Sequence, residues 1–169
     1  MIYNNSVANI VRFVGLVLVQ VILLNRINFL GYINPYLYIL FIILLPINLS
    51  QWKTIFFGFL LGLSVDVFMD SGGVHAAACL VAAYARPLVL RFTYGISYDY
   101  QTIKFYKTPF QERLMYVSMI VLIHHLCLFL LVFFSFSHWL LILKNTLFSA
   151  IFTILLILIV TALFKRRGE

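Results

Sequence analysis

The chain has 169 residues, of which 64% are hydrophobic and 10% are charged. Soluble domains of this size carry about a quarter charged residues, so the composition excludes an ordinary water-soluble protein and predicts one domain embedded in lipid. Twelve lysines and arginines oppose five acidic residues, which gives a net charge of +7. Because these basic residues fall in polar connections and near the ends of apolar stretches, they indicate orientation in a membrane and not nucleic-acid binding.

The first apolar stretch, residues 7–24, is close to the length of about 20 residues that a spanning helix needs. It contains an intramembrane polar residue, Gln20. The residues before it lack the pattern of a cleaved signal peptide, so we expect this helix to stay in the mature protein. A polar, turn-prone segment follows at 25–35.

Two shorter apolar stretches, 36–47 and 54–69, are separated by a polar break. Each is too short to cross a bilayer upright at full thickness. Two interpretations remain open: two thin spanning helices packed within protein, or one re-entrant hairpin. The hairpin would lift Lys53 into the membrane, where a charge is costly, so we favour two spanning helices.

Three further helices are predicted at 74–90, 114–136 and 145–164, with a cytoplasmic loop at 91–113. The sequence therefore predicts an all-α integral membrane protein in which residues 1–169 form a single polytopic domain of about six spans. The tail Lys165, Arg166 and Arg167 places both termini in the cytoplasm. In this topology ten basic residues are cytoplasmic, and Arg26 and Lys144 are outside.

Small and acidic residues recur at four-residue spacing in the third predicted helix: Gly58, Gly62, Asp66 and Asp70. Residues at this spacing share one helix face, and two glycines on it let another helix approach closely. We expect the acid one turn further on to contact the same neighbour. Packing alone and packing with a functional polar contact both fit. A catalytic carboxylate pair is disfavoured, because Asp70 is expected at the water interface.

The fourth predicted helix follows Gly73 and starts with His75 and Ala76, after which alanines are frequent. We expect this small-residue helix to pack against the glycine face of the third helix. His75 is either an interfacial histidine with a satisfied ring or a partner of Asp70. Both residues lie near the turn between the two helices.

Four other polar residues are candidates for membrane anchoring or interhelical contacts. Arg86 and Arg91 mark the predicted cytoplasmic end of the fourth helix, where they would anchor to anionic headgroups or dock a cytoplasmic partner. His124 and His125 lie within the fifth helix, where neighbouring side chains diverge by about 100° and are not expected to chelate one metal. An interhelical hydrogen bond, or a proton or partner contact, explains each histidine, as it explains Gln20.

Cys79 and Cys127 lie inside apolar stretches, so we predict neither a disulfide nor a metal site. The sequence has no phosphate-binding glycine loop, no HExxH motif and no nucleophile elbow. We therefore expect no catalytic residues and no cofactor, and the sequence favours a protein that is not an enzyme.

The third and fourth predicted helices together resemble the signature region of the MreD family of bacterial rod shape-determining proteins. The resemblance lies in a glycine-bearing helix that reaches an aspartate, a glycine turn and an alanine-rich helix. Here these are Gly58, Gly62, Asp66, Gly73 and residues 76–83. The overall plan is also similar, with short second and third segments, longer final helices and a basic C-terminus.

This resemblance implies a non-enzymatic, multi-pass scaffold in the bacterial inner membrane that supports peptidoglycan synthesis and rod cell shape. Its implied partner is MreC, and through MreC the MreB filament, the RodA glycosyltransferase and a penicillin-binding transpeptidase. The glycine face would be a candidate binding site for MreC, and a homodimer is left open. The alternative is the substrate-binding membrane subunit of an energy-coupling-factor vitamin transporter, which is similar in plan and needs a roofed polar pocket.

Overall fold

The computed structural model describes residues 6–25, 27, 33–99, 103, 105–134 and 136–164. Five of the basic residues used to predict the topology lie outside the described residues: Arg26, Lys104, Lys165, Arg166 and Arg167. Every regular element in the described part of the chain is helical. The prediction of an all-α protein is confirmed in this respect.

The helices follow one another along the chain with short connections. Helix α1 (Ser6–Val19) continues into the π-helical turn η1 (Gln20–Leu24), and the 3-10 turn η2 (Leu37–Ile39) continues into α2 (Leu40–Leu44). The remaining elements are α3 (Gln51–Met69), α4 (Val74–Tyr94), α5 (Ile96–Asp99), η3 (Phe105–Lys107), α6 (Phe110–Phe133), η4 (Phe136–His138) and α7 (Trp139–Leu163).

Five helical stretches in the described residues are long and apolar enough to cross a membrane. They are Val7–Leu24, Gln51–Met69, Val74–Tyr94, Phe110–Phe133 and Trp139–Leu163. Large apolar side chains remain exposed along them, such as Val11 on α1, Leu88 on α4 and Leu155 on α7. Such surfaces suit contact with lipid, and the chain is a multi-pass membrane protein.

The structure corrects the predictions for the second and third segments. The predicted helix at 36–47 is wrong in length, because its helical part is a three-residue 3-10 turn followed by a five-residue α-helix. Leu45 is extended (ψ 145°), as expected before Pro46, and this ends α2. Conversely, α3 begins at Gln51 and has 19 residues, so it is not short.

Other helix ends also differ from the predictions. Helix α4 continues past Pro87 to Tyr94, and α6 begins at Phe110, so the predicted loop at 91–113 is shorter at both ends. Helix α7 begins at Trp139, six residues before its predicted start. The polar residues Lys144 and Asn145 lie inside this helix. The prediction from the sequence placed the start of the helix wrongly at Asn145.

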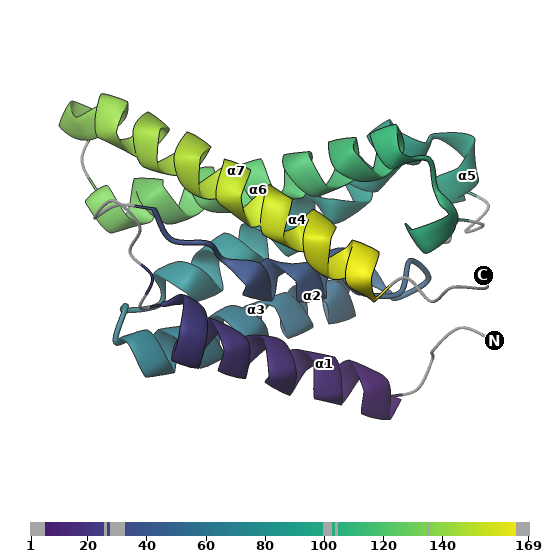
Figure 1. The fold of residues 1–169 in the computed structure, drawn as a ribbon, viewed down its shortest axis with the longest axis horizontal. Helices are drawn as coiled ribbons and strands as arrows, with labels where there is room; N and C mark the ends of the chain where they lie inside the picture. Colours follow the sequence, from purple (N-terminus) through teal and green to yellow (C-terminus); the bar gives the residue numbers. More distant parts are fainter. Residues whose placement is uncertain are drawn as a thin grey trace.

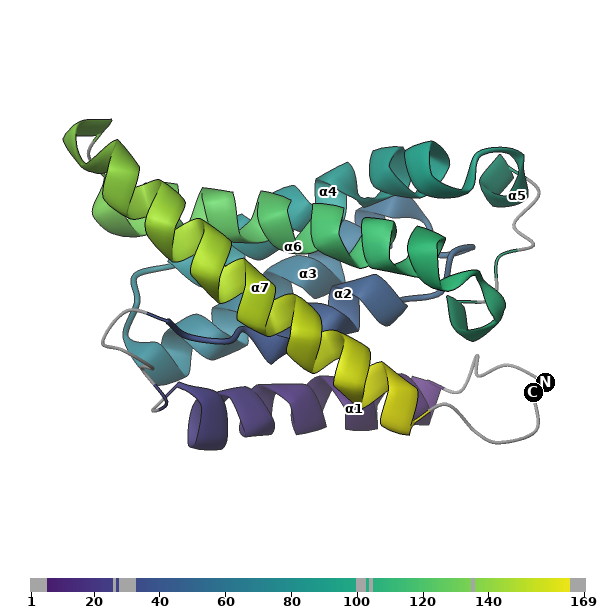
Figure 2. The same cartoon turned by 45° about the horizontal axis from the view of Figure 1, so that its top comes forward.

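The elements form a bundle in which α7 crosses the others at an angle (Figure 1). Residues 33–45, hereafter the buried segment, run lengthwise through the bundle between α1 and α3 in chain order (Figure 1). The start of α1 and the end of α7 lie at the same end of the molecule (Figures 1 and 2).

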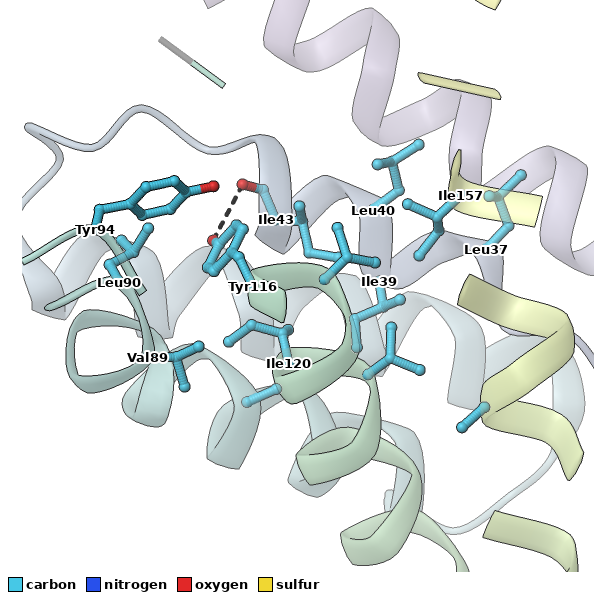
Figure 3. Packing of buried hydrophobic residues seen from close by; sticks show 14 of the residues in the cluster. Leu37, Ile39, Leu40, Ile43, Val89, Leu90, Tyr94, Tyr116, Ile120 and Ile157 are labelled. Carbon is cyan, nitrogen blue, oxygen red and sulfur yellow. Dashed lines mark hydrogen bonds between the residues drawn. The ribbon is translucent and has the colours of Figure 1, made fainter. Parts of the chain in front are cut away.

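The buried segment supplies much of the hydrophobic core. Its side chains include Leu37, Ile39, Leu40 and Ile43, which pack against residues of α4, α6 and α7 (Figure 3). Tyr38, Phe41 and Ile42 join a second cluster with residues of α3 and α4. Because nearly every described side chain from Ile33 to Leu45 is buried, surrounding helices shield this segment from lipid.

Candidate functional site: the buried segment and its polar contacts

Part of the buried segment is not helical, so its backbone N–H and C=O groups need hydrogen-bond partners outside a regular helix. Residues 34–36 lie outside any helix, and the helical part ends after Leu44. In a membrane interior an unpaired N–H or C=O group has no water to bind, so non-helical backbone is tolerated where protein groups satisfy it. The described polar side chains around this segment fulfil that requirement at both of its ends.

Gln20 and Thr153 bind the backbone where the segment enters the bundle. The Gln20 side chain donates from Nε2 to the Pro35 carbonyl at 3.1 Å, and its Oε1 accepts from the Tyr38 N–H at 3.4 Å. The Tyr36 N–H donates to Thr153 Oγ1 on α7 at 3.0 Å. Gln20, predicted as an intramembrane polar residue, thus joins η1 to the segment.

Arg86 and Tyr116 bind the backbone where α2 ends. The Arg86 guanidinium donates to the Leu45 carbonyl, and its Nε donates to the Tyr116 hydroxyl at 3.0 Å. The Tyr116 hydroxyl donates to the Ile43 carbonyl at 3.2 Å (Figure 3). The last carbonyls of a helix lack intrahelical partners, and these two side chains supply the missing donors.

This position corrects the predicted role of Arg86. Its side chain is 3% exposed and faces the core, so anchoring to lipid headgroups at the surface is wrong for this residue. Arg91, one and a half turns further along α4, is exposed at the end of the helix. The two arginines, which the sequence treated alike, therefore lie in different environments.

A tyrosine and two histidines meet in the middle of the bundle. The Tyr38 hydroxyl lies 2.8 Å from His75 Nδ1 and 2.9 Å from His124 Nε2. A phenol both donates and accepts, so it can satisfy one ring as donor and the other as acceptor. The three side chains join the buried segment to α4 and α6 through a single hydroxyl group.

His125 extends these contacts to α7. Its Nε2 lies 3.1 Å from Thr153 Oγ1, its Nδ1 lies 2.9 Å from the Val121 carbonyl, and the two Nδ1 atoms of His124 and His125 are 3.4 Å apart. Both histidines are fully buried, but His124 also contacts Tyr38 in η2, whereas His125 also contacts Thr153 on α7. Among the described residues, no group of three or more His, Cys, Asp or Glu is placed to hold a metal ion.

Asp66 caps the start of α4. Its carboxylate accepts hydrogen bonds from Ser71 Oγ at 2.5 Å, the His75 N–H at 3.0 Å and the Ala76 N–H at 2.7 Å. The first N–H groups of a helix lack intrahelical partners, and the positive end of the helix dipole also stabilises a carboxylate at this position. Asp66 therefore fixes how α4 follows α3.

The other residues of this turn have backbone roles. Asp70 is exposed and ends α3 in a left-handed conformation (φ 50°), and Gly73 precedes α4 with a φ of 92°. The suggested pairing of His75 with Asp70 is wrong, because the buried His75 ring faces the core and binds Tyr38, whereas Asp70 is exposed.

The glycine face of α3 packs directly on α4. A Cβ atom added to Gly58 would lie 2.9 Å from the Ala83 Cβ, and one added to Gly62 would lie 2.6 Å from the Ala76 nitrogen. Both distances are shorter than ordinary packing contacts, so each glycine is needed for this approach. The structure places α4 on the face that the sequence offered as a candidate binding site for MreC.

The sequence did not single out Tyr38, Tyr116 or Thr153, although each binds the buried segment. Tyrosine and threonine are common in apolar stretches, so their presence there does not indicate a functional contact. The feature that could have pointed to these residues is the buried segment itself. An apolar run too short to span and preceded by Pro35 predicts non-helical backbone, which in turn requires polar partners on other helices.

The described polar residues of this site mainly join helices and complete backbone hydrogen bonds. Cys79 is buried and Cys127 is partly buried, and both are free thiols. Gln20, His75, Arg86, His124 and His125 all lie around the buried segment, whereas Asp70 and Arg91 are exposed. Searches of protein-family models, curated proteins and solved structures return no match to this chain.

Proposed function

We propose that the protein is a non-enzymatic membrane scaffold of the MreD type, which binds MreC and supports peptidoglycan synthesis and rod cell shape. The proposal starts from the resemblance of the α3–α4 region to that family. The residues that carry the resemblance form one structural unit, in which Gly58 and Gly62 contact α4 and Asp66 caps it. A rigid helix pair of this kind suits a protein whose task is to hold partners in place.

The observation that carries the proposal is the filled centre of the bundle. Tyr38, His75 and His124 occupy it and hydrogen-bond to one another. The cavity beside Arg86, close to this centre, has a volume of about 40 Å³, whereas pockets for small molecules measure roughly 300–1,000 Å³. A larger cleft of about 380 Å³ lies between the end of α4 and the start of α6, where it is open to the outside. A vitamin-binding subunit needs a roofed polar pocket, so the filled centre supports the scaffold over the transporter subunit.

The proposed topology has six crossings of the inner membrane, with the buried segment as the second. It rests on the lengthwise course of that segment and on the common end reached by α1 and α7 (Figures 1 and 2). This common end is cytoplasmic in our proposal. The described basic residues near it include Lys53, Arg91 and Lys107, as expected for the positive-inside rule.

The partner surface must differ from the one that the sequence suggested. Because α4 covers the glycine face of α3, a transmembrane helix of MreC would bind the outer surface of the bundle. Exposed apolar residues occur on α1, α3, α4, α6 and α7, so the surface is wide enough for a single-pass partner beside lipid. Gly62 then affects partner binding through the fold and not through direct contact.

The test is affinity purification of the tagged protein from native membranes in mild detergent, with mass spectrometry of the retained proteins. The scaffold proposal predicts recovery of MreC, together with elongation enzymes. An unrelated multi-pass protein of the same membrane, tagged and expressed at the same level, controls for general co-extraction.

Two results would overturn the proposal. Paired transporter ATPases or a tightly held vitamin in the purified sample would place the protein in the uptake class. Absence of MreC above the level in the control sample, from cells that contain MreC, would remove the scaffold function. Both results require a folded sample. Elution of the protein as a single peak in size-exclusion chromatography checks that it is folded.

A further inference from the structure

The buried rings of His75, His124 and His125 have two possible roles, as carriers of protons or as fixed hydrogen-bonding groups between helices. A neutral imidazole carries one hydrogen, on either Nδ1 or Nε2. The nitrogen that carries the hydrogen donates, and the other nitrogen accepts. A partner that is able only to accept, or only to donate, therefore fixes the tautomer of the ring that it faces.

His125 faces a partner of this kind. Its Nδ1 lies 2.9 Å from the Val121 carbonyl, which accepts and never donates, so Nδ1 carries the hydrogen. In the neutral ring Nε2 is then bare, and it accepts from the Thr153 hydroxyl at 3.1 Å. The Thr153 oxygen in turn accepts from the Tyr36 N–H at 3.0 Å. Each donor in this part of the cluster thus faces an acceptor.

The tautomer of His124 follows from its neighbour on α6. The two Nδ1 atoms are 3.4 Å apart, and because His125 Nδ1 carries a hydrogen, His124 Nδ1 is bare. His124 Nε2 then carries the hydrogen and donates to the Tyr38 hydroxyl at 2.9 Å. The Tyr38 hydroxyl donates to His75 Nδ1 at 2.8 Å. Its second lone pair is left for the Cys79 thiol, which is also a hydrogen-bond partner of Tyr38.

The charged and titratable groups around the rings suit neutral histidines. The carboxylate of Asp66 binds the His75 N–H, but its oxygens accept three hydrogen bonds, and the start of α4 balances its charge. The other groups are the phenols of Tyr36 and Tyr38 and the thiol of Cys79, which are types uncharged near neutral pH. A buried charge without a counter-ion is costly, so a charged ring is unfavourable here.

We infer that these contacts form one hydrogen-bond chain of fixed direction, in which the three rings are neutral and each keeps a single tautomer. The chain leaves the buried segment at the Tyr36 N–H, passes through α7 and α6, and returns to the segment at Tyr38 before it ends on α4. The Val121 carbonyl sets the direction, because it is unable to donate. The cluster therefore joins α7 and α4 to the buried segment and carries no proton through the bundle.

Nuclear magnetic resonance of the imidazole nitrogens tests the inference, because nitrogens with and without a hydrogen give separate signals. The full-length protein with isotope-labelled histidine is placed in lipid bilayers, and His138→Gln removes the signal of the exposed fourth histidine. We expect the hydrogen on Nδ1 in His125 and on Nε2 in His75 and His124. The three tautomers should be unchanged between about pH 8 and about pH 5.5, a range in which unperturbed histidine changes charge.

Thr153→Val examines the start of the chain. Valine cannot donate, so the Nε2 signal of His125 should move while the hydrogen stays on Nδ1, held by the Val121 carbonyl. Thr153→Ser keeps the hydroxyl and should leave the signal near its original position. Thr161→Val is the matched control, because Thr161 is also a buried threonine of α7 but bonds to the Leu158 carbonyl. It should move none of the three sets of signals.

Three results would overturn the inference. A second hydrogen on any of the three rings at about pH 5.5 would show that the cluster takes up protons. A hydrogen on Nδ1 of His124 would reverse the direction of the chain at that step. Equal shifts from Thr153→Val and Thr161→Val would remove Thr153 from the chain. The denatured protein, in which these contacts are lost, is the control for detecting the second hydrogen, and no result depends on whether MreC is a partner.

Discussion

The α3–α4 pair and the buried segment are two regions held in the same bundle by different means. The α3–α4 pair consists of helices adjacent in sequence, joined by a short turn and packed through glycine and alanine. The buried segment is bound by residues far from it in sequence. Tyr36 and Thr153 are 117 positions apart, and Leu45 and Arg86 are 41 apart.

The difference concerns which force holds each region. In the helix pair, backbone groups between the ends are satisfied within their own helices except at Pro87 of α4, which has no N–H to donate, so close packing is the main requirement. In the buried segment, backbone groups depend on side chains of η1, α4, α6 and α7. We infer that the helix pair can form locally, whereas the segment is completed when the other helices are in place.

The largest effect is expected from Gly62→Leu, which breaks the helix pair. A side chain there collides with the backbone at the start of α4, so we expect a loss of more than about 3 kcal/mol and little folded protein. Gly15→Leu is the control, because a Cβ added at Gly15 meets nothing within 4 Å. Size-exclusion chromatography of fluorescent fusions measures both, and equal folded yields would contradict the packing argument.

Arg86→Ala tests the buried segment at its far end. The substitution leaves the Leu45 carbonyl without its described donor and removes a partner of Tyr116, so we expect a loss of about 2–3 kcal/mol. Arg91→Ala, on the exposed end of the same helix, should change stability by less than about 0.5 kcal/mol. The thermal unfolding midpoints of the two variants are compared, with the labelling of newly exposed cysteines as the signal of unfolding. Similar midpoints would show that Arg86 does not support the segment.

Asp66→Asn examines the polar part of the helix pair. The carboxylate accepts three hydrogen bonds, and an amide would direct its NH₂ group at one of the same donors. We expect a loss of about 1–2 kcal/mol, the usual size for a helix cap. Asp70→Asn is the matched control, since asparagine tolerates the left-handed backbone of this position. A smaller loss for Asp66→Asn than for Asp70→Asn would argue against the cap.

Tyr38→Phe should have the smallest effect, about 1 kcal/mol for one buried hydroxyl with two partners. Its sharper readout is nuclear magnetic resonance of the imidazole nitrogens. The signals of His75 and His124 should both shift, because each ring loses the same hydroxyl. Tyr84→Phe, on an exposed part of α4, should shift neither signal. Movement of one histidine signal alone would exclude the shared hydrogen bond.

Particular residues show how far the sequence led toward the candidate site. Gln20, His124 and His125 were identified because a polar group in an apolar stretch needs a partner wherever it lies. Arg86 was misplaced at the surface, since an arginine near a helix end normally reaches the headgroups. Its burial depends on the unpaired carbonyls of α2, and these appear after another part of the chain has ended its helix.

The sequence by itself determined the lipid-embedded class, the apolar helices and the close approach of α3 to α4, because these depend on composition, periodicity and neighbours a few residues away. The tertiary structure alone decided that residues 33–45 run through the bundle as a short helix and extended backbone. Their conformation is stabilised by hydrogen bonds from helices that come before and long after them in the chain. No local pattern encodes such partners, since each contributes one ordinary polar side chain to a site assembled by folding.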